Sequence, residues 1–244
     1  DIHQKGKIKA ATTRLDDSIL GDLTVNTKLD PGETKNVDFV LTWHFPNFYG
    51  REFGGVKVGH SYAVRFNSAL EVAQYIEANR PRLFDDTREW VNTWYDSSLP
   101  YWLLDRTMAN TSTLATTTCY RHQDGRFWAW EGIGCCTGTC THVWHYAQAV
   151  GRLFPEVERD QRERIDFGMA LKENGEIGYR ALLKSSMGPA FDGQCGRILG
   201  AYREHTMSAD HAFLTNNWKA VKKAIVYMID QDINLDGILE GSQP

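Results

Sequence analysis

Residues 68–81 read SALEVAQYIEANRP and mark the point where the sequence changes its periodicity. Ser68 followed by Glu71 is a capping-box pattern, which is typical of a helix N-terminus. Apolar side chains then recur at helical spacing at Ala69, Val72, Ala73 and Ile76. We expect a helix that ends before Pro81, because proline is a poor residue for a helix interior.

Upstream of residue 68 the pattern is that of a strand. After an Asp30-Pro31-Gly32 turn, the apolar residues Val37, Phe39 and Leu41 stand at every second position, which indicates a half-buried strand. We therefore expect residues 1 to about 66 to be β-rich.

Downstream of residue 81 helical signals repeat. Asp86 with Glu89 opens a segment with apolar positions up to Trp94, and Pro100 and Pro155 suit the first turns of two further helices. Other helical segments are expected over residues 141–154, 155–171, 193–205 and 217–230. The sequence predicts a mainly α fold with an N-terminal β portion.

Composition excludes several classes of protein. The chain has 244 residues, a formal net charge of −4 and a pI near 6.1, which does not suit a nucleic-acid binder. With 42% hydrophobic residues it can bury a core, and it contains no run of about 18 apolar residues for a membrane span. Residues 1–30 lack a secretory signal pattern, so we expect a soluble protein and leave its compartment open.

The stretch Phe127–His145 concentrates chemically active side chains. Glu131 lies between Trp130 and Gly132, where an indole would partly desolvate a carboxylate and a glycine would leave room for a ligand. Three glycines, Gly132, Gly134 and Gly138, favour an irregular loop. The alternative is that Glu131 is an ordinary surface carboxylate.

Two metal sites are weaker alternatives. Cys135, Cys136 and Cys140 could bind zinc with His142, His145 or Glu131, although adjacent cysteines are an awkward ligand pair and small buried thiols are the simpler interpretation. Asp232, Asn234 and Asp236 copy the first half of a calcium loop. Its twelfth position is Gln243, so an Asx-rich turn is the favoured interpretation.

Asp192-Gly193-Gln194 precedes a helical segment. Asp192 could cap that helix, or Asp192 and Gln194 could contact a ligand; capping is the favoured interpretation.

Several segments together resemble glycoside hydrolase family 116, in particular a bacterial branch related to non-lysosomal glucosylceramidases and bacterial β-glucosidases. They are Val40–Asn47, Tyr62–Phe66, Trp130–Gly132 with Cys140–Trp144, Leu153–Arg159 and Asn234–Glu240. The resemblance implies a β-sandwich followed by an (α/α)6 barrel. Residues 1–66 would be the end of the sandwich, and residues 67–244 the first helices of a barrel that the remainder of the polypeptide completes.

The resemblance also implies a function. Glu131 corresponds to the nucleophile of a retaining β-glycosidase acting on a β-linked glucoside, xyloside or related sugar, with no cofactor required. The acid/base would be an aspartate beyond Pro244, so residues 1–244 alone are expected to be inactive. Trp130 would form an apolar wall, and His142, Asp192 or Gln194 would contact sugar hydroxyls. His142 stands where better-known members have an aspartate, which leaves the sugar open.

Two other functional hypotheses are compatible with the sequence. One is a glycosidase with a zinc-bound cysteine nucleophile, and the other is a carbohydrate-binding protein that does not cleave its ligand. The leading hypothesis requires Glu131 to lie at the floor of a sugar-sized hollow.

Overall fold

The structure is a computed structural model that describes residues 23–132, 135–145, 148–181 and 188–241, without the side chains of Arg51, Asn110, His142 and Val143. The chain divides into two units, residues 1–41 and 42–244, which are described separately.

The described part of the first unit is extended chain with one turn. Gly32 has φ +82°, and the Glu33 amide donates to the Asp30 carbonyl at 2.9 Å, which confirms the expected Asp30-Pro31-Gly32 turn. The strand expected from Val37 onward is wrong: residues 33–42 form no strand, and Phe39 and Leu41 are exposed. Alternation alone does not make a strand, because its backbone amides and carbonyls need a neighbouring chain, and no such ladder exists among the described residues.

Residues 42–66 hold only short elements. An isolated bridge joins Tyr49 to Lys57, with the 3-10 helix η1 (Arg51–Phe53) between them, and helix α1 follows (Tyr62–Arg65). The expected β-rich character of this region is therefore limited to a bridge. A β-sandwich is not formed by the described residues, and it remains an expectation from the resemblance.

Helix α2 (Ala69–Tyr95) begins where the sequence predicts. The Ser68 hydroxyl accepts a hydrogen bond from the Glu71 amide at 3.1 Å, so the predicted cap is confirmed. The predicted end at Pro81 is wrong, since Pro81 lies inside the helix. Asp86 does not open a new helix; it pairs with Arg82 one turn earlier at 2.8 Å.

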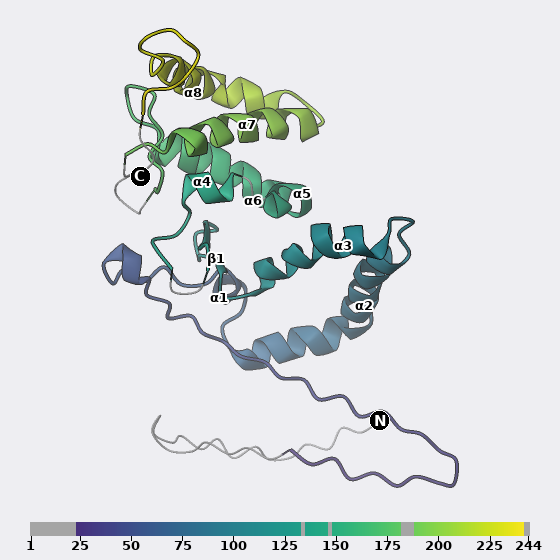
Figure 1. Ribbon diagram of the computed structural model, residues 1–244. Coiled ribbons are helices and arrows are strands. Elements are labelled where there is room, and N and C mark those ends of the chain that lie inside the picture. Colours follow the sequence, from purple (N-terminus) through teal and green to yellow (C-terminus); the bar gives the residue numbers. More distant parts are fainter. Residues whose placement is uncertain (1–22, 133–134, 146–147, 182–187, 242–244) are drawn as a thin grey trace. The chain divides into compact units, whose positions relative to one another are not determined.

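The remaining elements of the second unit are mostly helical (Figure 1). They are α3 (Tyr101–Met108), η2 (Ala109–Ala115), α4 (Thr141–Trp144), α5 (Ala149–Leu153), α6 (Pro155–Asp160), the π-helix η3 (Gln161–Met169), α7 (Phe191–Met207) and α8 (Ala212–Ile229). Pro155 starts α6 as expected, but the helix expected over residues 141–154 is two short helices. Even the longest described helix lacks the sustained apolar run that a membrane span requires.

A two-stranded antiparallel sheet interrupts the helices. Strands β1 (Cys119–Arg121) and β2 (Phe127–Ala129) pair with Tyr120 opposite Trp128. This is the only sheet among the described residues, and it lies in the part of the sequence that was expected to be helical. The hairpin turns at Gly125, which has φ +86°.

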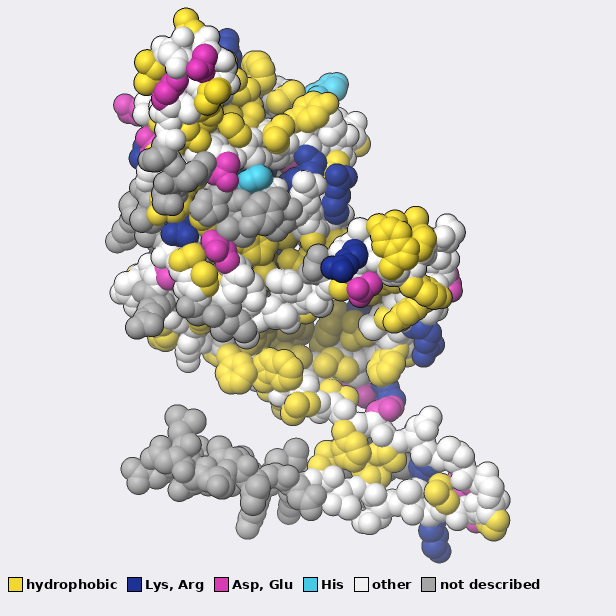
Figure 2. All heavy atoms as spheres, in the orientation of Figure 1, with side chains coloured by type: hydrophobic (Ala, Val, Ile, Leu, Met, Phe, Trp, Pro, Cys, Tyr) yellow, Lys and Arg dark blue, Asp and Glu magenta, His cyan; other side chains and the backbone are white. Residues whose placement is uncertain are grey.

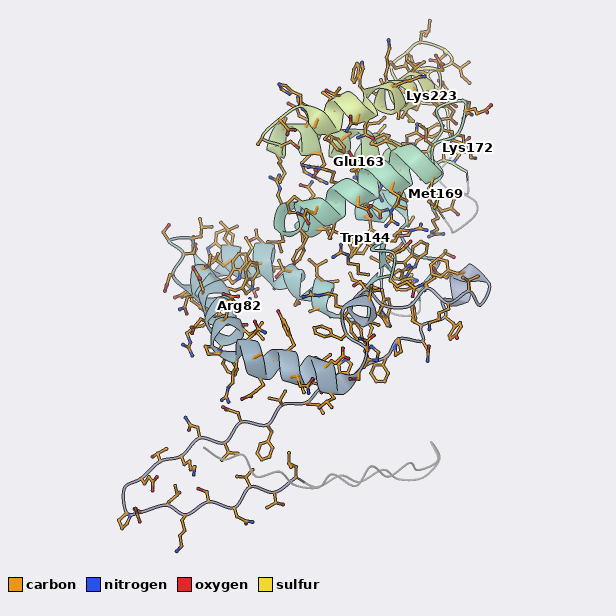
Figure 3. The ribbon with its side chains drawn as sticks, turned by 180° about the vertical axis from the view of Figure 1, so that it is seen from behind. Arg82, Trp144, Glu163, Met169, Lys172 and Lys223 are labelled. Carbon is orange, nitrogen blue, oxygen red and sulfur yellow. The ribbon has the colours of Figure 1, made fainter. Side chains whose placement is uncertain are left out.

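The main core lies where η3, α7 and α8 pack together (Figure 1). Ile165, Phe213 and Ala224 are among its buried members. On the same elements Glu163 of η3, labelled in Figure 3, accepts a hydrogen bond from Asn217 of α8 at 3.0 Å. The two long helices α7 and α8 therefore pack against each other and against η3. The described residues do not form a complete (α/α)6 barrel.

Candidate functional site

Glu131 follows the end of β2 by two residues. Trp128 on that strand is fully buried against Phe53, with ring centroids 4.7 Å apart, and Trp130 packs edge-on against Tyr120 at 5.4 Å. This aromatic cluster anchors the chain immediately before Glu131. The exposed carboxylate therefore extends from a rigid base.

A carboxylate from η1 holds both ends of the loop that carries Glu131. Glu52 accepts hydrogen bonds from the indole nitrogens of Trp128 at 2.9 Å and Trp130 at 2.6 Å, and from the backbone amide of Gly138 at 3.1 Å. We call this arrangement the Glu52 clamp. Sequence reasoning missed it, because no spacing rule links residue 52 to residues 128–138.

The return end of the loop is tightly packed. A Cβ at Gly138 would lie 2.4 Å from the Trp128 indole nitrogen, so glycine is required here by close approach rather than by a positive φ. The next residue, Thr139, is a β-branched residue with φ +53°, and its amide donates to the Ala129 carbonyl at 2.6 Å. Such a conformation costs of order 1–3 kcal/mol, and the surrounding contacts hold it in place.

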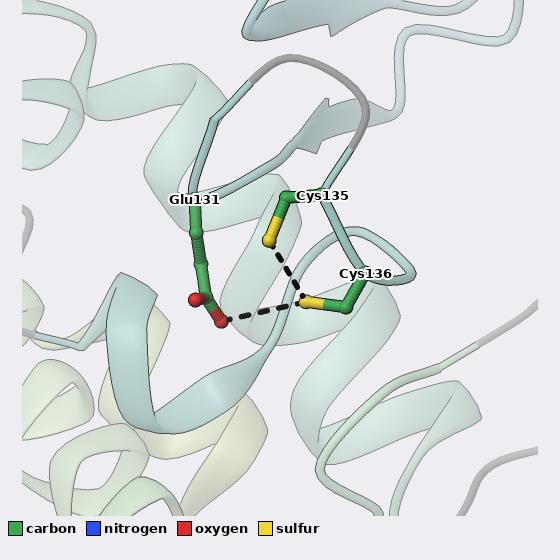
Figure 4. Close-up of side chains that lie close together, drawn as sticks. All are labelled: Glu131, Cys135 and Cys136. Carbon is green, nitrogen blue, oxygen red and sulfur yellow. Dashed lines mark hydrogen bonds between the residues drawn. The ribbon is translucent and has the colours of Figure 1, made fainter.

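Two thiols lie against Glu131 (Figure 4). The Cys136 thiol donates to Glu131 Oε1 at 3.6 Å, and Cys135 Sγ lies 3.5 Å from Cys136 Sγ. On the other side, Arg180 Nη2 donates to Cys136 Sγ at 3.0 Å. Glu131, Cys135 and Cys136 are all exposed.

The environment of Cys136 favours its protonated form. Desolvation, the hydrogen bond with Cys135 and the Glu131 carboxylate raise the pKa of the Cys136 thiol to about 11, against the lowering effect of Arg180. A free thiolate nucleophile at neutral pH is therefore not what this site provides.

Of the other residues considered for zinc, Cys140 and His145 are not part of this cluster. Cys140 is buried, with 1% of its surface exposed, and is not one of the three clustered ligands. The side chain of His142 lies outside the described residues. His145 packs against Gly196 of α7, where an added Cβ would come within 2.2 Å of the imidazole.

Gln194 does not serve as the expected sugar contact. It is fully buried; its oxygen accepts from the Ile177 amide at 2.8 Å, and its nitrogen donates to the carbonyls of Gly175 at 3.0 Å and Ala224 at 3.1 Å. Through these three hydrogen bonds the Gln194 side chain links the Leu171–Ile177 turn to α8, and its polar atoms are already occupied. An isolated polar side chain in the sequence gives no sign of such burial.

Asp192 also differs from expectation. It lies in the first turn of α7 and accepts from the Gly193 amide at 2.6 Å, while Ala190 occupies the N-cap position. The favoured capping role is therefore wrong in position, although an acidic residue in a first turn still stabilises a helix. Its side chain is exposed.

The C-terminal loop forms the expected Asx-rich turn. The Asp236 amide donates to Asp232 Oδ1 and to Asn234 Oδ1, both at 3.0 Å, and Leu235 has φ +60°. Glu240 completes a cluster with Asp232 and Asp236, in place of Gln243, which lies outside the described residues. Backbone amides satisfy these oxygens in the present conformation.

Two apolar cavities of the second unit do not include Glu131. An apolar cavity of about 840 Å³ lies between α2, α3 and η2, and a second of about 760 Å³ between η2 and α5. Exposed aromatic residues such as Trp90 and Tyr101 belong to the first cavity, and Figure 2 shows hydrophobic side chains gathered over that corner. Glu131 lines neither cavity, so the sugar-sized hollow expected around it is not one of these two.

A buried ionic network lies between η3 and α7. Asp166 Oδ2 forms ion pairs with Arg162, whose Nη1 lies 2.9 Å away, and with Arg197, whose Nε lies 3.5 Å away, while Glu158 pairs with Arg203. Burial lowers the pKa of Arg197 to about 10, which the carboxylates partly oppose. The i,i+4 spacing of Arg162 and Asp166 suggests a helical pair, but the sequence does not show that it is buried.

Comparison with known proteins identifies the N-terminal part of the chain. Residues 1–83, about a third of the sequence, match the family model described as beta-glucosidase 2, glycosyl-hydrolase family 116 N-term. The matched stretch includes Glu52 and ends inside α2. A search of curated proteins found no match. The match supports membership of glycoside hydrolase family 116 through residues 1–83, which are similar to the N-terminal domain of that family.

Proposed function

We propose that the protein containing this chain is a retaining β-glycosidase that cleaves a β-linked glucoside, xyloside or related sugar. The match of residues 1–83 to the N-terminal domain of a β-glucosidase family carries this proposal. Within the chain, Glu131 is the proposed nucleophile because the Trp130–Gly132 segment resembles the nucleophile segment of that family, and the Glu52 clamp fixes the base of its loop. Glu131 is exposed and lines neither large cavity, so the described residues do not form the hollow that this role requires. A fixed base with an accessible carboxylate is what attack on a bound sugar requires.

The proposed chemistry has two steps. Glu131 attacks the anomeric carbon and forms a glycosyl ester, while a second carboxyl group protonates the leaving oxygen. The same second group then removes a proton from the water that hydrolyses the ester. In a retaining enzyme this group lies about 5–5.5 Å from the nucleophile.

Trp130 and Asp192 remain proposed sugar contacts. Trp130 is half-buried and its nitrogen is engaged by Glu52, so it can offer only the exposed part of its ring to an apolar sugar face. Asp192 is exposed and could accept hydrogen bonds from hydroxyl groups. His142 stays a prediction from the sequence.

Trapping of the glycosyl-enzyme tests this proposal. The complete protein is incubated with a 2-fluoro glycoside inactivator, digested, and mapped by mass spectrometry. We expect one label on Glu131, no label in Glu131→Gln, and normal labelling in Glu77→Gln, which alters an exposed glutamate of α2. Labelling of a different carboxylate in the unmodified protein would remove Glu131 from the role.

A further inference from the structure

The loop after β2 gathers three metal-ligating side chains around one point. One oxygen of Glu131 and the sulfur atoms of Cys135 and Cys136 all lie within 4.8 Å of one another. Cys140, the third cysteine of the loop, is not one of the clustered ligands. The folded chain therefore selects two thiols and one carboxylate from a longer set of candidates.

The spacing of these atoms suits tetrahedral coordination. Zinc binds thiolate sulfur at about 2.3 Å and carboxylate oxygen at about 2.0–2.2 Å, so neighbouring tetrahedral ligands lie roughly 3.8 Å apart for two sulfurs and roughly 3.6 Å for sulfur and oxygen. The corresponding distances are 3.5 Å between Cys135 and Cys136, and 3.6 Å between Cys136 and Glu131. These two distances are within a few tenths of an ångström of a tetrahedral set, and the third pair, Glu131 and Cys135, lies within 4.8 Å.

Arg180 supplies an outer contact and balances charge. Two thiolates and a carboxylate carry three negative charges, and a divalent ion leaves one of them uncompensated. The Arg180 guanidinium lies 3.0 Å from Cys136 Sγ and adds the missing positive charge. Hydrogen bonds from such outer groups orient ligands and tune a metal site.

We infer that Glu131, Cys135 and Cys136 form a binding site for a thiophilic divalent cation, for which zinc is the best-fitting ion. All three ligands are exposed, so water can fill the fourth position. Each thiol loses one proton when it binds, and two protons are released per ion. Because a thiol binds a metal ion in its deprotonated form, affinity rises with pH.

This inference does not depend on the proposed glycosidase activity. It does use the same carboxylate, and therefore a bound ion and a sugar would compete for Glu131.

Metal titration tests the site without any substrate. The complete protein is reduced, freed of metal with a chelator and titrated with zinc, and with cobalt(II) to detect sulfur-to-metal charge-transfer absorption. We expect one ion per chain and the charge-transfer band. Cys135→Ser and Cys136→Ser should each reduce zinc occupancy to roughly a tenth, and Arg180→Gln should weaken binding by about tenfold, as outer-contact losses do.

Cys195→Ser is the matched control, since Cys195 lies on α7 and is not one of the clustered ligands. It should bind zinc as the unmodified protein does. Because Cys135 and Cys136 are exposed, circular dichroism should show that their serine variants keep the fold. Failure of the unmodified protein to bind more zinc than the Cys135→Ser, Cys136→Ser double variant would overturn the inference, whatever the labelling of Glu131 shows.

Discussion

Replacing Glu52 by alanine removes the acceptor of three hydrogen bonds at once. The Trp128 indole is fully buried and Gly138 is also buried, so neither donor can turn to water. A buried donor left without a partner costs about 1–3 kcal/mol. Trp130 is half-buried, and solvent can replace part of its bond.

We therefore expect Glu52→Ala to lower the free energy of unfolding by about 3–5 kcal/mol. Glu52→Gln keeps one side-chain acceptor but faces some of the same donors with an NH₂ group, and we expect a loss of about 1–3 kcal/mol. Glu77→Ala, an exposed residue on α2, is the control and should change stability by less than about 0.5 kcal/mol.

Urea unfolding followed by tryptophan fluorescence measures these differences, because two of the affected donors are indoles. If Glu52→Ala unfolds at the same midpoint and slope as Glu77→Ala, the Glu52 clamp does not stabilise the fold and the reasoning fails.

Three further outcomes are expected. Gly175→Ala should lose about 2–4 kcal/mol of stability by thermal unfolding, because Gly175 has φ +97° and a Cβ would lie 2.4 Å from the Lys223 carbonyl (Figure 3 labels Lys223); Gly188→Ala, with open space around it, should lose little. Burial lowers the pKa of His122 from 6.5 to about 4, so its neutral form stabilises the fold fully above pH 6.5, and roughly 3 kcal/mol should be lost as pH falls toward 4; His122→Phe should flatten that part of a pH–stability curve. Zinc should inhibit turnover competitively and a chelator should restore it, provided that both proposals for Glu131 hold; noncompetitive inhibition would contradict a shared carboxylate.

Local signals in the sequence located two helix starts, at Ser68 and Pro155, but the start predicted at Asp86 was wrong. The Ser68–Glu71 cap rests on a hydrogen bond within one turn, and Pro155 occupies a first-turn position where its missing N–H costs no helical bond; neither signal needs a distant partner. The end of α2 was misplaced because Pro81 removes only one backbone bond, while pairs such as Arg82–Asp86 continue the helix.

Elements that depend on distant partners were harder to predict. The β1–β2 hairpin was missed although Asp124-Gly125 is a turn signal, because its strands have only three residues each. The expected strand near Val37 shows the reverse error, an alternating pattern without a neighbouring chain among the described residues.

The candidate site shows the same division. Glu131, Cys135 and Cys136 lie within six residues of one another, so the sequence alone shows that they share one loop. Glu52 and Arg180, which contact that loop from 78 residues before Trp130 and 44 residues after Cys136, follow no spacing rule. Gln194 illustrates how burial, which a single sequence does not reveal, can turn a predicted ligand contact into a structural one.

The Glu52 clamp has a consequence for how this chain can be divided into pieces. The acid that anchors the loop belongs to the stretch by which the family is recognised, whereas the loop itself lies well beyond that stretch. Excising the N-terminal region to obtain a minimal catalytic piece would leave two tryptophan nitrogens without their anchor. Residues 1–83 and the loop after β2 should therefore be expressed together, and exchanged together in chimeric proteins.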